Sequence, residues 1–116
     1  SICYGTERLQ DLLSRSKSLG VAFDIGNFTF AGEDPVEAYE TLKGRVRHVH
    51  VKDRASLDDM TPVPAGTGCS KIETVLQKME DRGYDGWYTI EIFGSKQMLK
   101  DLETAYSNVK SFLDGR

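Results

Sequence analysis

Cysteine and histidine are scarce in this sequence, and long apolar runs are missing from it. The 116 residues include two cysteines, Cys3 and Cys69, with no CxxC pair, which favours free thiols in a reducing compartment over a disulfide framework. No apolar run approaches the roughly 18 residues that a membrane-spanning helix needs, and the first residues show no signal-peptide pattern. We therefore expect a cytoplasmic protein that is neither secreted nor embedded in a membrane.

An excess of positive charge is also missing. The net charge is −3 and the two signs are interspersed, so the sequence has no basic stripe of the kind that follows a phosphate backbone. No nucleic-acid partner is expected. The length and the 39% hydrophobic content suit one domain with a modest core, and we expect residues 1–116 to form a single unit.

Helical and extended patterns alternate along the chain, which indicates an α/β fold. Local signals mark two helix starts: Asp34 as N-cap before Pro35, and a capping box formed by Ser70 and Glu73. The expected helices are 6–18, 34–44, 70–83 and 98–116, and the expected strands are 21–27, 46–53 and 87–92. This order predicts a parallel sheet with right-handed helical crossovers.

The strand faces indicate where a site lies. Side chains alternate between the two faces of a strand, so each strand has one apolar face and one face that ends in a polar group: Asp24, His50 and Glu91. Sites in parallel α/β folds are built at the C-terminal ends of the strands, and we expect these side chains to meet there. Such a set suits a divalent ion such as manganese, cobalt, zinc or magnesium.

Each candidate ligand also has a structural interpretation. His48 and His50 share a strand face, but His50 is nearer the strand end and is favoured as the ligand, whereas His48 is expected to pack. Asp24 is equally suited to capping the next turn. Glu91 has the strongest case, because a carboxylate on a buried strand is costly unless it is paired or bound to metal.

Four segments, taken together, resemble a known family. VAFDIGN, RVRHVHVKD, PAGTG followed by a helix, and RGYDGWYTIEIFG are similar in order and spacing to the second half of the xylose isomerase-like TIM barrels. That family includes sugar phosphate isomerases and epimerases and is related to the apurinic-site endonucleases. The likeness covers roughly residues 6–113. It implies a partial (β/α)8 barrel whose three strands correspond to the sixth, seventh and eighth.

The resemblance also implies a site and a reaction. Asp24, His50 and Glu91 would hold the divalent metal, with a fourth ligand, a glutamate, in a strand before residue 1. The expected reaction is the isomerisation or epimerisation of a sugar or sugar phosphate through an enediolate, with Glu91 transferring a proton. The residues expected near the substrate are Asn27, His48, Lys52 and Arg54, and the backbone of Gly66–Gly68 is expected to line an anion site.

The length limits this interpretation. A complete (β/α)8 barrel needs about 250 residues, so we expect the C-terminal half of a longer protein, inactive unless it associates with another copy or with its missing half. Two alternatives stay open. One is a metal-dependent phosphodiesterase of the apurinic-endonuclease type, which is less favoured because the chain has two histidines and a negative net charge. The other is a non-catalytic truncated barrel.

Overall fold

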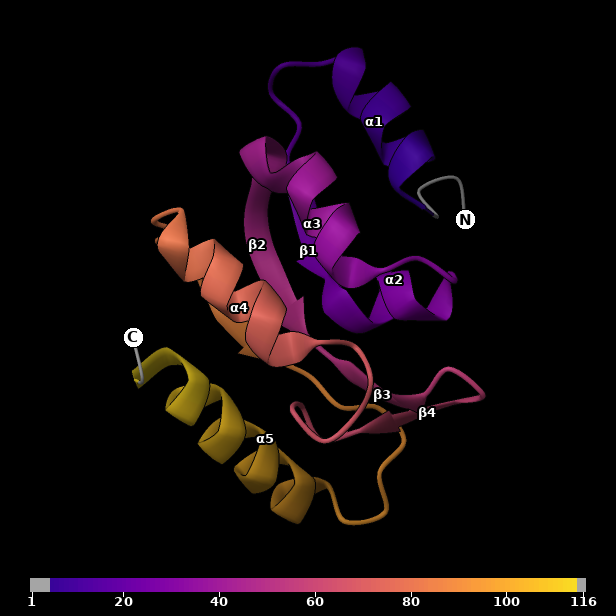
Figure 1. Ribbon diagram of the computed structural model, residues 1–116, viewed down its shortest axis with the longest axis vertical. Coiled ribbons are helices and arrows are strands. Elements are labelled where there is room, and N and C mark those ends of the chain that lie inside the picture. The colour runs from indigo at the N-terminus through magenta and orange to yellow at the C-terminus, as the bar shows by residue number, and fades with distance from the viewer. Residues whose placement is uncertain (1–4, 115–116) are drawn as a thin grey trace.

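Three parallel strands in the order β1–β2–β5 form the centre of the computed structural model, which describes residues 5–114 (Figure 1). A separate antiparallel hairpin is formed by β3 and β4. The strands are β1 (Val21–Asp24), β2 (Val46–Val51), β3 (Asp53–Ser56), β4 (Asp59–Val63) and β5 (Tyr88–Ile90). The helices are α1 (Thr6–Ser14), α2 (Ile25–Phe30), α3 (Pro35–Leu42), the 3₁₀ turn η1 (Lys43–Arg45), α4 (Ile72–Asp81) and α5 (Met98–Asp114).

The two faces of the parallel sheet differ as the alternation predicts. On one face, Phe23, Val49 and Val51 are fully buried beneath the helices, because burying apolar surface is the main favourable term in folding. On the other face, Ala22 and Thr89 are exposed. The predicted α/β class and parallel sheet are confirmed, and the helices of residues 5–114 cover one face of the sheet.

The predicted second and third strands are longer than β2 and β5, and two other predicted element ends are wrong by more residues. The first strand ends at Asp24, because residues 25–30 turn directly into the short helix α2. The first helix ends at Ser14 rather than at residue 18. After it, the Arg45 guanidinium donates to the carbonyl oxygens of Leu13, Ser16 and Leu19, which satisfies these groups outside a helix.

The start of the third predicted helix differs from the sequence pattern. Lys71 occupies the N-cap of α4 in a left-handed conformation, and no side chain caps this end. Ser70 is fully buried, and its hydroxyl accepts a hydrogen bond from the Thr29 hydroxyl at 2.9 Å. The predicted Ser70–Glu73 capping box is therefore wrong. The Ser70 hydroxyl instead forms a hydrogen bond with Thr29 of α2, which connects the start of α4 to that helix. The other predicted cap is confirmed, since Asp34 accepts from the Val36 amide at 2.8 Å.

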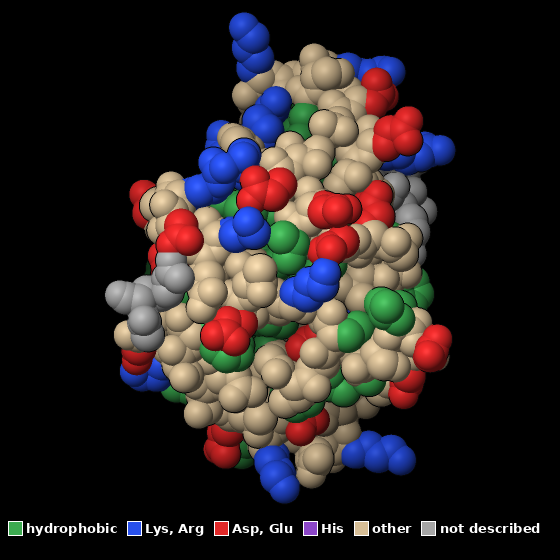
Figure 2. All heavy atoms as spheres, in the orientation of Figure 1, with side chains coloured by type: hydrophobic (Ala, Val, Ile, Leu, Met, Phe, Trp, Pro, Cys, Tyr) green, Lys and Arg blue, Asp and Glu red, His purple; other side chains and the backbone are tan. Residues whose placement is uncertain are grey.

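Surface features agree with the composition. Figure 2 shows basic and acidic side chains interspersed on the face in view, without a continuous basic stripe. Cys69 is a free thiol, whereas Cys3 lies outside the described residues. Within residues 5–114, no helix is both long enough and apolar enough to cross a bilayer.

Candidate metal centre

Three strand ends bring Asp24, His50 and Glu91 together. The parallel register places Asp24 beside His50, and the Glu91 amide continues the β2–β5 ladder by donating to the Val51 carbonyl at 3.0 Å. Asp24 is also the N-cap of α2, because its Oδ1 atom accepts from the Asn27 amide at 3.1 Å. The two interpretations of Asp24 are thus compatible: Oδ1 caps the helix, and Oδ2 faces the other two side chains.

The distances within this group are those of a shared ion site. His50 Nδ1 lies 3.0 Å from Glu91 Oε2 and 3.9 Å from Asp24 Oδ2, and the ligand atoms of all three residues lie within 4.8 Å of one another. Metal–ligand bonds of about 2.0–2.2 Å place neighbouring ligand atoms roughly 3–4 Å apart. One nitrogen and two carboxylate oxygens suit zinc, manganese, cobalt or magnesium. These residues therefore fit a divalent ion, and the three elements contribute one donor each.

Lys52 lies in the same group rather than apart from it. Its Nζ atom is 3.3 Å from Asp24 Oδ2 and 3.5 Å from Glu91 Oε2, and its side chain is 13% exposed. These are the same two oxygens that face His50 Nδ1. The structure thus places a tethered positive charge on both carboxylates, which lowers the repulsion between them.

His48 lies on β2 two residues before His50, one layer deeper in the sheet. It pairs with Ala22 in the register, two positions before the Asp24–His50 pair. Its Nε2 atom is 3.1 Å from the Thr89 hydroxyl, and its ring packs edge-on against that of His50 with 5.0 Å between centroids. His48 therefore contacts a candidate ligand and lies outside the donor set.

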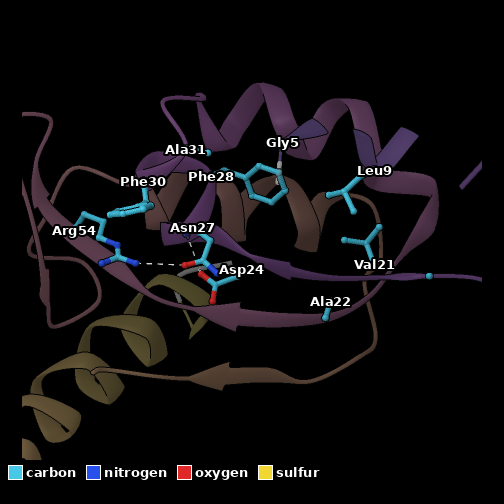
Figure 3. Close-up of a pocket in the computed structure, with 11 residues that line it drawn as sticks. Gly5, Leu9, Val21, Ala22, Asp24, Asn27, Phe28, Phe30, Ala31 and Arg54 are labelled. Carbon is cyan, nitrogen blue, oxygen red and sulfur yellow. Dashed lines mark hydrogen bonds between the residues drawn. The ribbon is translucent and has the colours of Figure 1, made fainter. Parts of the chain in front are cut away.

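Asn27 and Arg54 form a second part of the site (Figure 3). Arg54 donates to the Asn27 side-chain oxygen at 3.3 Å and stacks over the Phe30 ring at 5.1 Å. Both residues line a cavity of ≈ 630 Å³ that also includes Asp24. Phe30 was not among the expected site residues, because a single exposed aromatic in a short segment carries no pattern.

The loop expected to line an anion site binds the protein's own carboxylate. Asp53 is 1% exposed, and its two oxygens accept from the backbone amides of Gly66, Gly68 and Ser70, each at 2.9 Å. A Cβ atom at Gly68 would lie 1.9 Å from the Arg54 carbonyl oxygen, so the close approach requires glycine. The Gly66 and Gly68 amides are therefore occupied by Asp53, and the expectation that this loop lines an anion site is wrong.

Comparison with known proteins identifies the class. A family model described as xylose isomerase-like TIM barrel matches residues 1–114, and the chain belongs to this family. An uncharacterized protein of Methanocaldococcus jannaschii is 36% identical over 91 residues, which cover 76% of this chain and 30% of that protein. Inosose dehydratase of Lacticaseibacillus casei is 26% identical over 93% of this chain and 41% of the enzyme.

A solved structure supports the same assignment. The crystal structure of a D-tagatose 3-epimerase-like protein superposes with a TM-score of 0.78 at 28% identity, over 96% of this chain and 41% of that one. The present chain thus spans less than half the length of each of these relatives. Since the matched part includes all three parallel strands, the fold is that of a partial (β/α)8 barrel.

Proposed function

We propose that this chain supplies the metal-binding side of an enzyme that moves a proton at a carbon next to the carbonyl of a sugar or sugar phosphate. The observation that carries the proposal is the convergence of Asp24, His50 and Glu91 on one cation position at the strand ends. Isomerisation and epimerisation both begin by removing such a proton. The likeness to a D-tagatose 3-epimerase-like protein supports this reaction class.

Dehydration is the second candidate reaction. The inosose dehydratase relative favours it, and loss of water beside a carbonyl also begins with removal of the neighbouring proton. The same residues therefore serve either outcome. The difference between them lies in whether the substrate carries a leaving hydroxyl next to the carbon that loses its proton.

Each side chain has a proposed role. A bound divalent ion would be held by Asp24, His50 and Glu91, and would supply positive charge beside the substrate oxygens. Glu91 is also the proton-transfer group: Oε2 faces His50 and Lys52, whereas Oε1 forms no hydrogen bond with any residue from 5 to 114. That oxygen is therefore free to take a proton from the substrate.

The remaining expected residues contact or orient the substrate. Asn27 and Arg54 line the cavity next to Asp24, and the Lys52 ammonium lies 3.3 Å from Asp24 Oδ2. His48 supports His50 from the layer below. In this arrangement Asn27 and Lys52 bind hydroxyl groups, and His48 fixes the orientation of the His50 ring.

We propose further that the chain is the C-terminal half of its barrel and works with a complementary half. In the three-stranded sheet, β1 and β5 are both edge strands, and edge strands present unpaired backbone groups that barrel closure normally satisfies. The complementary half would contribute a glutamate as fourth ligand. A second copy of this chain is the alternative way to cover the open face.

A phosphodiesterase of the apurinic-endonuclease type is less well supported. That chemistry uses a cluster of metal ions, and among residues 5–114 one group of three metal-binding side chains lies close enough to hold an ion. A non-catalytic barrel module would not need Asp24, His50 and Glu91 to converge on one cation position. Neither alternative accounts for the geometry as directly.

Solvent exchange tests the proposed chemistry. The longer protein that contains this chain is incubated in D₂O with ketose and aldose sugars and their phosphates, and deuterium at the carbon next to the carbonyl is measured by NMR. We expect metal-dependent exchange that is lost in Glu91→Gln and kept in Glu103→Gln, an exposed residue on α5. Exchange that persists in Glu91→Gln, or is absent from every sugar tested, would overturn the proposal.

A further inference from the structure

A second cavity lies at the end of the sheet opposite the candidate metal centre. It is lined by Val46, the first residue of β2, and by Tyr84 and Asp85 from the segment before β5. Parallel strands all begin at one end of a sheet, and the three candidate metal ligands lie at the other end. Substrates react at the strand ends in barrels of this kind, so this cavity is a separate site.

The cavity is bordered by a hydroxyl group that has no hydrogen-bond partner among the described residues. Tyr39 is 3% exposed, and its ring packs edge-on against Phe23 in the core with 5.9 Å between centroids. Tyr39 also lines the cavity, and its hydroxyl forms no hydrogen bond with any residue from 5 to 114. An unpaired buried donor destabilises a fold, and an acceptor in the cavity would remove this cost.

The Tyr39 hydroxyl is a donor at neutral pH. Burial raises the pKa of Tyr39 above its usual 10.0, and the positive charge of Arg82 opposes this rise without cancelling it. The hydroxyl therefore keeps its proton, and Arg82 lies close enough to act on it. Arg82 and Lys43 line the same cavity. A hydroxyl, a guanidinium and an ammonium group thus border one small space, and all three donate hydrogen bonds.

Cations outnumber carboxylates around this cavity. Lys43 and Arg82 lie 3.0 and 3.7 Å from the Glu40 carboxylate, which Lys78 also contacts at 3.2 Å. Within the described part of the chain, Glu40 is the one carboxylate within 4.0 Å of these three cations. Three positive charges therefore share one negative charge, and an excess remains when the lining residue Asp85 is counted as well.

Two further arginines add positive charge at this end of the sheet. Arg45 follows the cavity residue Gly44 in the chain, and Arg47 donates to the Gly44 carbonyl at 3.2 Å. Both guanidinium groups donate to backbone carbonyls, and neither lies within 4.0 Å of a carboxylate of residues 5–114. The C-terminal ends of α3 and α4 carry about half a negative charge each, which these cations outweigh. The cavity therefore favours a negatively charged ligand.

We propose that this cavity binds a compact oxyanion, inorganic phosphate or the phosphate or carboxylate group of a small metabolite, through Tyr39, Lys43 and Arg82. Its volume of ≈ 270 Å³ suits such a group rather than a whole sugar. Lys43 belongs to η1 at the end of α3, Arg82 follows α4, and the two helices lie side by side over the sheet (Figure 1). The bound anion connects these helix ends and stabilises the folded chain. This site does not depend on the proposed reaction.

Anion titrations test the proposal on the longer protein that contains this chain. Sodium phosphate, sodium acetate and, as the neutral control, glycerol are added separately at constant ionic strength. The NMR signals of the Arg82 Nε–H and the Gly44 amide, two groups of the cavity lining, are followed. We expect at least one anion to shift both signals to saturation and glycerol to leave them unchanged, and the tighter anion identifies the group that binds. Lack of a saturable shift with both anions would overturn the proposal.

Conservative variants show whether the named side chains form the site. Tyr39→Phe removes the unpaired hydroxyl and keeps the ring in the core, and it is expected to bind the anion about threefold to tenfold more weakly. Tyr106→Phe, at an exposed position of α5, is its matched control. Lys43→Met is expected to bind roughly tenfold more weakly, with the exposed Lys100→Met as control. Equal weakening in each variant and its control would show general surface attraction and contradict the proposal.

Glu40 allows a test in which the expected change has the opposite sign. Glu40→Gln keeps the shape of the side chain and removes the negative charge that three cations share, so the anion should bind about threefold more tightly or better. Unchanged or weaker binding in this variant would contradict the proposed site. Absence of Mn²⁺ binding by the wild type would refute the candidate metal centre and leave the anion site standing.

Discussion

At the scale of single residues, Lys52 supplies positive charge to the two carboxylates of the candidate metal centre. A divalent cation that binds Asp24 Oδ2 and Glu91 Oε2 must displace the Lys52 ammonium, which lies 3.3 and 3.5 Å from them. We expect Lys52→Met to bind Mn²⁺ roughly tenfold more tightly than the wild type, because the competing cation is gone. Isothermal titration calorimetry measures the change.

The matched control for Lys52 is Lys96→Met, which removes the same charge at an exposed residue. It should leave the Mn²⁺ affinity near that of the wild type. If the Lys52→Met protein bound Mn²⁺ no more tightly than the Lys96→Met protein, the ammonium group would not compete for the ion.

Asp53 is the residue on which the loop after β4 depends. Asp53→Ala leaves the amides of Gly66, Gly68 and Ser70 without their acceptor, and of these three residues Ser70 is fully buried. We expect a loss of about 3 kcal/mol in the free energy of unfolding, because an unpaired buried donor costs about 1–3 kcal/mol and the two less buried amides add to it. Urea denaturation checks this value. Asp58→Ala, at an exposed position of the hairpin turn, should be nearly neutral, and similar losses in both would contradict the account.

The three candidate ligands were predictable from sequence, whereas the role of Asp53 was not. Asp24 and His50 follow from strand alternation and from their place near strand ends. Glu91 lies at the strand ends beside Asp24 and His50, as predicted. Its side chain is 39% exposed, so the argument that a buried carboxylate needs a partner does not apply to it. The partners of Asp53 are backbone amides 13–17 residues away, and backbone donors leave no pattern in a sequence.

At the scale of elements, the start of α3 combines a helix cap with an ion pair. Asp34 accepts from the Val36 amide and from Lys71, and the Lys71 ammonium is the main reason that the pKa of Asp34 lies below its usual 3.8. We expect Asp34→Ala to lose about 1 kcal/mol of stability at neutral pH, the usual value of a cap, and Asp34→Asn to keep most of it.

The pH dependence of this ion pair has a defined sign. A lowered carboxyl pKa stabilises the fold above the unfolded value of 3.8, and this contribution is lost as the pH falls through the lower folded pKa. The stability difference between wild type and Asp34→Asn should therefore shrink below pH 3.8. Thermal unfolding across an acid pH series measures it. A difference that grew on acidification would have the wrong sign for this pair.

The β3–β4 hairpin is the element that was hardest to predict, and no helix or strand was predicted for residues 54–63. Ser56 pairs with Asp59 across a two-residue turn that contains no glycine, and Arg54 pairs with Pro62. Glycine-containing turns are the usual hairpin signal, and proline within a run argues against a strand. Helix α2 was not predicted for another reason, because its six residues are too few to show helical periodicity.

At the scale of the whole molecule, Trp87, the only tryptophan of the chain, directly precedes β5 at an edge of the sheet and has 81% of its surface exposed. We expect Trp87 to lose contact with water when a complementary half-barrel or a second copy covers this edge. Its fluorescence should then shift to shorter wavelength, and sedimentation gives the mass of the assembly. Trp87 that stays equally accessible to acrylamide in an assembled complex would place the interface elsewhere.

The topology of the sheet was more predictable than the way in which its second face is covered. Alternation of helices and strands predicted the parallel sheet, because parallel strands require crossover connections. What covers the other face of the sheet was not predictable, because Ala22 and Thr89 on that face are exposed among the described residues.

The Mn²⁺ affinity of two histidine variants tests the metal centre most directly. His50→Gln removes a ligand, whereas His48→Gln removes the neighbouring histidine, which contacts Thr89 instead. Electron paramagnetic resonance of free Mn²⁺ should show affinity at least about tenfold weaker in His50→Gln and within roughly twofold of wild type in His48→Gln. Equal affinity in both variants, or no binding by the wild type, would contradict a centre formed by Asp24, His50 and Glu91.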